Sequence, residues 1–166
     1  MHDDESRQYP VEEDMPMQRR VWRFERIGWY VLLLIVLLAL AGAFGNGPLS
    51  EATAVSADGR LRVDYPRLSR AGTTESLRIT VHGTPGEPLQ LLLGGSLLRE
   101  ASIETLQPEP QASLSHGKSL LLELGTSGDG IATLYLTLRS EHVGSLEGVA
   151  RIGPSSAVRF TIFLYP

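Results

Sequence analysis

The side chains that could carry metal or thiol chemistry are few and scattered along this chain of 166 residues. His82, His116 and His142 are far apart and lack the paired spacing of zinc ligands, so we do not expect them to form a metal site. The sequence contains no cysteine, which excludes thiolate catalysis, cysteine-ligated metals and disulfides. We therefore predict no bound metal or cofactor.

Two glycine-rich segments match catalytic motifs only in part. Gly94-Gly95-Ser96-Leu97-Leu98 lacks the second glycine of a nucleophile elbow. Residues 125–130 (GTSGDG) contain the glycines of a phosphate cradle, but such a cradle needs a helix N-terminus behind it. Because this segment joins two expected strands, we predict a hairpin turn there.

The acidic residues give no catalytic pattern. Glu104, Glu109 and Glu123 are candidates for paired carboxylates, but the sequence does not reveal the distance between them. Asp129 suits a turn cap, since no acidic loop of the EF-hand type surrounds it. We predict that the protein is not an enzyme.

The most informative segment is residues 27–44 (IGWYVLLLIVLLALAGAF), which contains no charged residue. A helix of this length covers about 27 Å, close to the ~30 Å hydrocarbon thickness of a bilayer. We predict a single transmembrane helix here. Its N-terminal side carries basic and aromatic residues suited to the lipid headgroups. These predicted interface anchors are Arg19, Arg20, Trp22, Arg23, Arg26, Trp29 and Tyr30.

The charges that flank this segment predict its orientation. The arginines precede it, and no charge follows it before Glu51, so the positive-inside rule places the N-terminus in the cytoplasm. A cleaved signal peptide is the alternative, because 39–41 and 41–43 are passable cleavage sites. Ala39 and Ala43 have the spacing of small residues that pack helices, which allows a weak homodimer through the helix.

Composition predicts the compartment and excludes nucleic acid as a partner. Arginine greatly outnumbers lysine, a bias that suggests a GC-rich bacterial genome, so we predict the cytoplasmic membrane of a bacterium, with the C-terminal domain in the periplasm or outside the cell. Residues 1–18 read as an acidic, disordered cytoplasmic tail, and 19–26 as a basic juxtamembrane segment. No basic face of the kind that binds nucleic acid is evident beyond the membrane segment.

Beyond a predicted linker at 45–57, apolar residues alternate with polar ones at the period of a β-strand. Glycine and proline bound nearly every run, and residues 97–101 suit a single helical turn. We predict an all-β domain at 58–166, a β-sandwich of seven or eight strands, in which 120–124 and 131–139 form the clearest hairpin. The expected strands centre on residues 61–65, 77–81, 89–93, 101–106, 120–124, 134–138, 149–152 and 158–165.

The strand pattern ASIETLQPEP, LLLELG and IATLYLTL resembles the immunoglobulin-like domains of bacterial surface and periplasmic proteins. The whole layout is similar to bacterial single-pass membrane proteins with a short extracytoplasmic β-domain that ends in an aromatic-Tyr-Pro tail, here Phe163 to Pro166. The resemblance implies an anchored immunoglobulin-like sandwich and implies no activity.

The last expected strand suggests where a partner binds. Phe160, Ile162 and Leu164 share one face, while Phe163 and Tyr165 lie on the other. The second face is covered by the domain's own loops, by lipid headgroups or by a partner, which makes Phe163 and Tyr165 candidate contacts. We expect a module that binds another membrane or envelope protein, with a domain that binds a small ligand or envelope polymer as the alternative. The lipid bilayer is the other expected partner.

Overall fold

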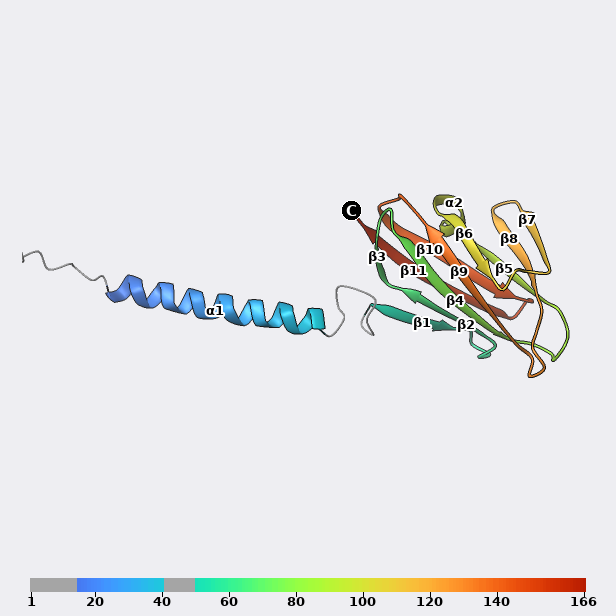
Figure 1. The fold of residues 1–166 in the computed structure, drawn as a ribbon, viewed down its shortest axis with the longest axis horizontal. Coiled ribbons are helices and arrows are strands. Elements are labelled where there is room, and N and C mark those ends of the chain that lie inside the picture. Colours follow the sequence, from blue (N-terminus) through green and yellow to red (C-terminus); the bar gives the residue numbers. More distant parts are fainter. Residues whose placement is uncertain (1–14, 41–49) are drawn as a thin grey trace, which may run out of the picture. The chain divides into compact units, whose positions relative to one another are not determined.

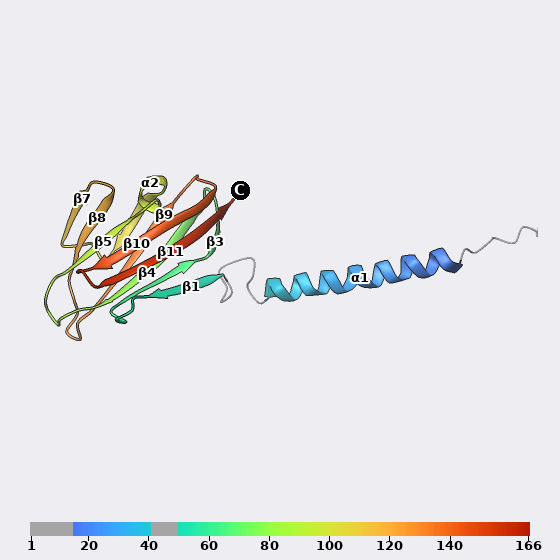
Figure 2. The same ribbon diagram turned by 180° about the vertical axis from the view of Figure 1, so that it is seen from behind.

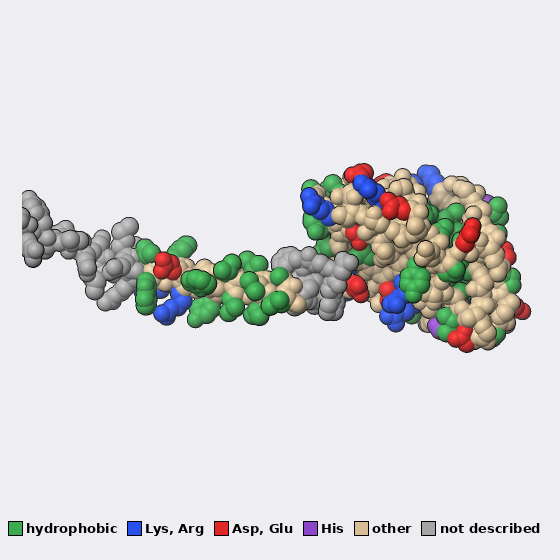
Figure 3. Space-filling view, viewed as in Figure 1, with side chains coloured by type: hydrophobic (Ala, Val, Ile, Leu, Met, Phe, Trp, Pro, Cys, Tyr) green, Lys and Arg blue, Asp and Glu red, His purple; other side chains and the backbone are tan. Residues whose placement is uncertain are grey.

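The computed structural model describes residues 15–40 and 50–166, which fall into two units. The N-terminal unit contains α1 (Met15–Leu40), whose apolar side chains are exposed to solvent (Figure 3). In the described residues, no helix combines the length and the apolar character that a membrane span requires. The predicted transmembrane helix is therefore unsupported by the structure, and its last four residues, 41–44, lie outside the described part.

The C-terminal unit is a sandwich of two β-sheets (Figures 1 and 2). The predicted two-sheet architecture is confirmed, but the number of strands is larger than the seven or eight expected. Sheet A has the order β1-β2-β4-β9-β6, and sheet B the order β3-β11-β10-β5-β8-β7. Sheet A is built from β1 (Glu51–Val55), β2 (Leu61–Pro66), β4 (Thr74–His82), β6 (Ser102–Gln107) and β9 (Ile131–Arg139), and sheet B from β3 (Leu68–Arg70), β5 (Leu89–Gly95), β7 (Ala112–His116), β8 (Ser119–Leu124), β10 (Gly144–Ile152) and β11 (Ser156–Tyr165).

The eight strands expected from alternation all form, and the predicted helical turn is α2 (Leu97–Glu100). Three further strands, β1, β3 and β7, were not expected. The first of them lies inside the predicted linker at 45–57, so the sandwich begins at Glu51 rather than at residue 58. Residues 1–14 and 45–49, which belong to the predicted tail and linker, lie outside the described residues.

The predicted hairpin of β8 and β9 is wrong. Each strand pairs within a different sheet, β8 with β5 and β7, and β9 with β4 and β6. The segment 125–130 therefore crosses from one sheet to the other. It is held against the β4–β5 connection, where the Gly83 amide donates to the Gly130 carbonyl at 2.7 Å. Six residues are long enough for this crossing, and it lets both apolar faces enter the same core.

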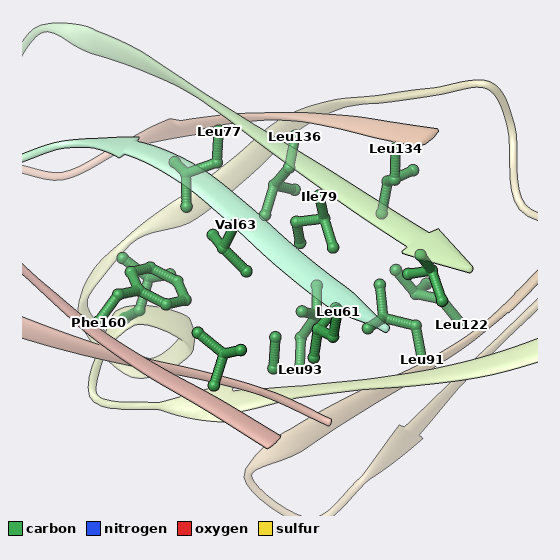
Figure 4. Close-up of a cluster of buried hydrophobic side chains, with 14 of the residues drawn as sticks. Leu61, Val63, Leu77, Ile79, Leu91, Leu93, Leu122, Leu134, Leu136 and Phe160 are labelled. Atoms are coloured by element: carbon green, nitrogen blue, oxygen red, sulfur yellow. The ribbon is translucent and has the colours of Figure 1, made fainter. Parts of the chain in front are cut away.

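The core consists of the alternating apolar residues that point inward from both sheets (Figure 4). Leu61, Ile79 and Leu134 in sheet A are fully buried, as are Leu91 and Leu122 in sheet B. Each such leucine or isoleucine stabilises the fold by about 1.5–3 kcal/mol relative to an exposed position. This shared core holds the two sheets together.

One glycine is required by the core. The ring of Phe160 on β11 lies directly over Gly148 on β10, where a Cβ atom would stand 2.2 Å from Phe160 Cζ. The ring also packs against that of Tyr65, with ring centroids 5.0 Å apart and planes at 42°. The small residue on β10 therefore lets an aromatic pair join sheet B to the end of β2.

A polar clasp joins the two sheets at the turn between β1 and β2. The carboxylate of Asp58 accepts hydrogen bonds from the hydroxyls of Ser156, the fully buried first residue of β11, and Ser56. The Ser56 hydroxyl in turn accepts the Leu61 amide at 3.0 Å. The hydrogen bonds from Ser156 and Ser56 lower the pKa of Asp58 to about 2.

This clasp predicts a specific loss of stability in acid. Because the pKa of Asp58 is lower in the folded than in the unfolded state, its contribution is complete above pH ~4 and is lost as the pH falls toward 2. We expect Asp58→Asn to unfold at lower urea concentration than the native chain at pH 6, and the difference to shrink between pH 4 and pH 2. Urea unfolding at each pH measures it; a difference that is constant over this range would contradict the assignment.

Candidate binding cleft

A cleft opens where sheet A divides. Strands β2 and β4 are paired from Leu61 to Asp64, where Asp64 lies opposite Arg78. Beyond this point β2 continues with β1 alone, whereas residues 74–77 of β4 pair with β9 alone. Pro66 ends β2 and has no amide hydrogen with which to extend the ladder. The two arms of the sheet diverge, and a cleft of about 860 Å³ lies between them.

The cleft is lined by aromatic rings, guanidinium groups and hydroxyls. Strand β3 and the end of β11 complete its walls. Side chains of this kind stack on flat groups and donate hydrogen bonds, and arginine and tyrosine, like tryptophan, are enriched among the residues that contribute most to protein binding. The lining includes Asp64, Leu68, Arg78, Tyr135 and Tyr165.

Asp64 organises one wall of the cleft. Its carboxylate accepts hydrogen bonds from Thr53 Oγ1 at 2.6 Å, Arg62 Nε at 3.0 Å and Arg78 Nε at 3.2 Å. These groups and Tyr135 form a row across the outer face of sheet A, because Thr53, Asp64, Arg78 and Tyr135 are opposite one another in register. Partial burial alone would raise the pKa of Asp64, but the hydrogen bonds from Thr53 and the arginines lower it overall. The carboxylate is therefore ionised and fixes Arg78 at the cleft.

A second hydrogen-bonded group shapes the opposite wall. The hydroxyl of Ser69, a buried residue of β3, donates to the carboxylate of Glu75 on β4. Thr73 Oγ1 lies 2.8 Å from the same Glu75 carboxylate oxygen and 2.6 Å from the Arg70 carbonyl oxygen. These bonds tie the short strand β3 of sheet B to the first residues of β4 in sheet A. Of the three carboxylates that line the cleft, Asp64 and Glu75 are thus engaged in holding its walls, and Glu51 is the third.

An exposed apolar patch adjoins the cleft. Phe163 on β11 lies opposite Leu68 on the parallel strand β3, and Tyr165 lies opposite Arg70. Leu68, Phe163 and Tyr165 are 50%, 46% and 45% exposed, whereas Phe160, Ile162 and Leu164 on the other face of β11 are buried. Leu68 and Tyr165 also line the cleft. The cleft and this patch form one continuous area, which we call the cleft surface.

The other residues singled out in the sequence are placed elsewhere. His82 ends β4, His116 ends β7, and His142 Nε2 lies 3.1 Å from Glu100 Oε2. Within residues 15–40 and 50–166, no group of three or more histidine and acidic side chains could hold a metal ion. Of the three glutamates, Glu104 and Glu123 belong to different sheets, and Glu109 lies in the loop between β6 and β7.

The glycine-rich candidates serve as connections. Gly95 ends β5 and precedes α2, and residues 125–130 link the sheets. The Ser127 hydroxyl donates to Asp129, and the Gly130 amide donates to the Ser127 carbonyl at 2.9 Å, so Asp129 caps a tight turn. Neither segment lines the cleft.

In the N-terminal unit, five of the predicted interface anchors are exposed on α1: Trp22, Arg23, Arg26, Trp29 and Tyr30. The Arg26 guanidinium lies over the Trp22 ring, with 5.2 Å between its central carbon and the ring centroid. Arg23, Trp29, Tyr30 and Ala39 lie on the same helix. Arg19 and Arg20 belong to the helical backbone, but their side chains are not described, and Ala43 lies outside the described residues. The predicted helix homodimer stays a prediction.

Comparisons with known proteins assign no family. No family model and no curated protein sequence matches the chain. Its fold is similar to domains 4 and 5 of the S-layer protein SbsC, at 11% identity and a TM-score of 0.39, over 70% of this chain and 53% of that one. It is also similar to a cohesin module of a family 33 glycoside hydrolase from Clostridium perfringens, at 9% identity and a TM-score of 0.41, over 68% of this chain and 96% of that one. The chain thus spans about half the length of the S-layer structure.

Sequence reasoning located the aromatic edge of the cleft surface but missed the cleft. Phe163 and Tyr165 stood out because a strand with apolar residues on both faces is unusual. Asp64, Arg78 and Tyr135 gave no signal, because each is a polar or aromatic residue on the outer face of a regular strand. Pro66 was the available clue, since a proline that ends a strand marks where pairing stops.

Proposed function

We propose that this chain is a membrane-anchored binding module whose cleft surface engages another membrane or envelope protein. The observation that carries the proposal is the exposed patch of Leu68, Phe163 and Tyr165, which is continuous with the cleft. Contiguous apolar surface on a small domain usually marks an interaction site. The aromatic rings supply the apolar contacts, and Arg78, fixed by Asp64, supplies directed hydrogen bonds.

The anchor is proposed from the apolar run 27–44 and its arginine flank. Fourteen of these residues, 27–40, belong to α1, and the large apolar side chains among them are exposed. A helix with apolar side chains on all sides has to be covered by lipid or protein. We propose that lipid covers it, with the N-terminus in the cytoplasm of a bacterium and an immunoglobulin-like sandwich on the outer side. We propose a non-catalytic role, because two of the acidic residues at the cleft, Asp64 and Glu75, are engaged in holding its walls.

A second candidate function is the binding of an envelope polymer, such as a polysaccharide. The row of Thr53, Asp64, Arg78 and Tyr135 favours it, because a flat arrangement of hydroxyl, charged and aromatic groups suits a chain rich in hydroxyls. The exposed leucine and phenylalanine of the patch favour a protein instead. Loss of binding on Tyr135→Ala with the patch intact would favour the polymer.

The proposed orientation predicts the behaviour of a fused reporter. An enzyme that is active only outside the cytoplasm should be active when fused after Pro166 and silent when fused before Met1. The reverse pattern would contradict the orientation. A soluble mature form that begins near residue 44 would replace the anchor with a cleaved signal peptide.

The proposed surface predicts the effect of removing two rings. In the full-length chain, purified from membranes in mild detergent, Phe163→Ser with Tyr165→Ser should reduce the recovery of the partner at least tenfold, because loss of one anchoring aromatic residue costs about 2 kcal/mol or more. Quantitative mass spectrometry of the co-purified proteins measures the recovery.

The control for that experiment is Val55→Ser with Val143→Ser, two side chains of similar exposure outside the cleft surface. This variant should retain the partner. The melting temperature of both variants should stay close to that of the native chain, because the four side chains are about half exposed. Unchanged recovery in the ring variant, or its unfolding, would contradict the proposed role of the two rings.

A further inference from the structure

The last strand of sheet B presents an unpaired edge. Strand β7 pairs with β8 and with no other strand of the described chain, and all five of its residues are exposed. Leu114, at its centre, is 63% exposed. In an antiparallel pair, alternate residues of an edge strand direct their amide and carbonyl groups away from the neighbour. These groups are available to a further strand.

Strand β7 lacks the features that usually protect a sheet edge. Charged residues, proline, bulges and shortness all discourage pairing between molecules. The other edge of the same sheet, β3, has three residues and carries Arg70, and the edge strand β6 of sheet A contains a register shift between Ile103 and Thr105. In contrast, β7 has no acidic, lysine, arginine or proline residue and is paired with β8 in unbroken register from Ala112 to His116.

The sequence of β7, Ala-Ser-Leu-Ser-His, is suited to antiparallel pairing with a second copy of itself. With the twofold axis at Leu114, each Ser113 would lie opposite Ser115 of the other copy, and each Ala112 opposite His116. The two Leu114 side chains would lie opposite each other. Pairs of serines and pairs of leucines are compatible across strands, and this register places no like charges together.

The outer face of sheet B would continue across such a pair. Leu92 on β5, Leu121 on β8 and Leu114 on β7 lie opposite one another in a row. Pairing of two β7 strands would join the two rows, so that six leucines cross the axis without interruption. Glu123, on β8, lies opposite Ala112 of β7. In the pair it would come near His116 of the second copy, which gives the contact complementary polar groups at both ends.

We infer that two copies of this chain associate through their β7 strands in antiparallel register, with Leu114 on the twofold axis. The two six-stranded sheets then form one continuous sheet of twelve strands. Five residues on each side make a small interface, so the dimer is weak and its population rises with concentration. The inference is independent of the proposed function, because β7 contributes no residue to the cleft surface.

The absence of cysteine permits a direct test by single-cysteine crosslinking of the full-length chain in detergent. Residues directly opposite in an antiparallel pair have Cα atoms about 4.5–5.5 Å apart, within the range that a disulfide spans. Leu114→Cys should therefore form a disulfide-linked dimer at least roughly tenfold faster than Val143→Cys, a control outside β7 that is also more than half exposed. Equal rates at the two positions, or no dimer with Leu114→Cys, would overturn the inference.

Mixed samples test the register. Chains with Ser113→Cys and chains with Ser115→Cys should crosslink to each other when mixed. Each alone should crosslink slowly, since like positions are then offset along the strands. Rapid crosslinking of Ser113→Cys with itself would overturn the register with Leu114 on the axis.

A charge at the axis provides a second measurement. Leu114→Lys should shift the dimer toward monomer in analytical ultracentrifugation, because two like charges would face each other. Leu114→Thr, which keeps a strand-forming residue without a charge, should weaken the dimer less than the lysine variant. A dimer that persists unchanged in Leu114→Lys would contradict the β7 interface and would favour contact through the helix.

Discussion

The rest of the structure depends on the burial of one alternating apolar face from each sheet in a single shared core. Leu77, Ile79 and Val81 on β4 meet Leu91 and Leu93 on β5 through this core. A shift of one residue in any central strand would turn its apolar side chains to solvent and its polar side chains inward, so the register of these strands is strongly fixed. Because the inward faces supply the stability, the outward faces are available for other roles. The row around Asp64 and the leucine row that ends at Leu114 both lie on outward faces.

The same constraint explains how much of the fold could be predicted. The eight strands with one buried face have clear alternation and were located from the sequence. The three that were missed, β1, β3 and β7, are all at sheet edges, where few side chains are buried. Strand β7 has no buried residue at all, and its sequence contains a single large apolar residue, Leu114. The β8–β9 connection shows a second limit: alternation identifies strands but does not say in which sheet each strand lies.

The cleft surface shows the same division between local and tertiary information. Phe163 and Tyr165 were recognised from the sequence of their own strand, because the period of two places them on the other face of that strand from Phe160 and Ile162. The cleft arises from the pairing of strands. Beyond Asp64 and Arg78, β2 stays paired with β1 and β4 stays paired with β9, but β2 and β4 are no longer paired with each other. No local pattern encodes where two strands separate, apart from the proline that ends β2. Leu68 became part of the patch only because its short strand pairs with β11.

The shared core can be tested most directly by native-state hydrogen exchange of the sandwich amides. If one core holds both sheets, the most protected amides of β4 and β9 in sheet A and of β5 and β10 in sheet B should exchange with the same free energy of opening, which should equal the free energy of global unfolding. Amides of β7 and of residues 74–76 at the cleft should exchange faster. Two distinct plateaus of protection, one for each sheet, would contradict the account, because they would show that the sheets open separately.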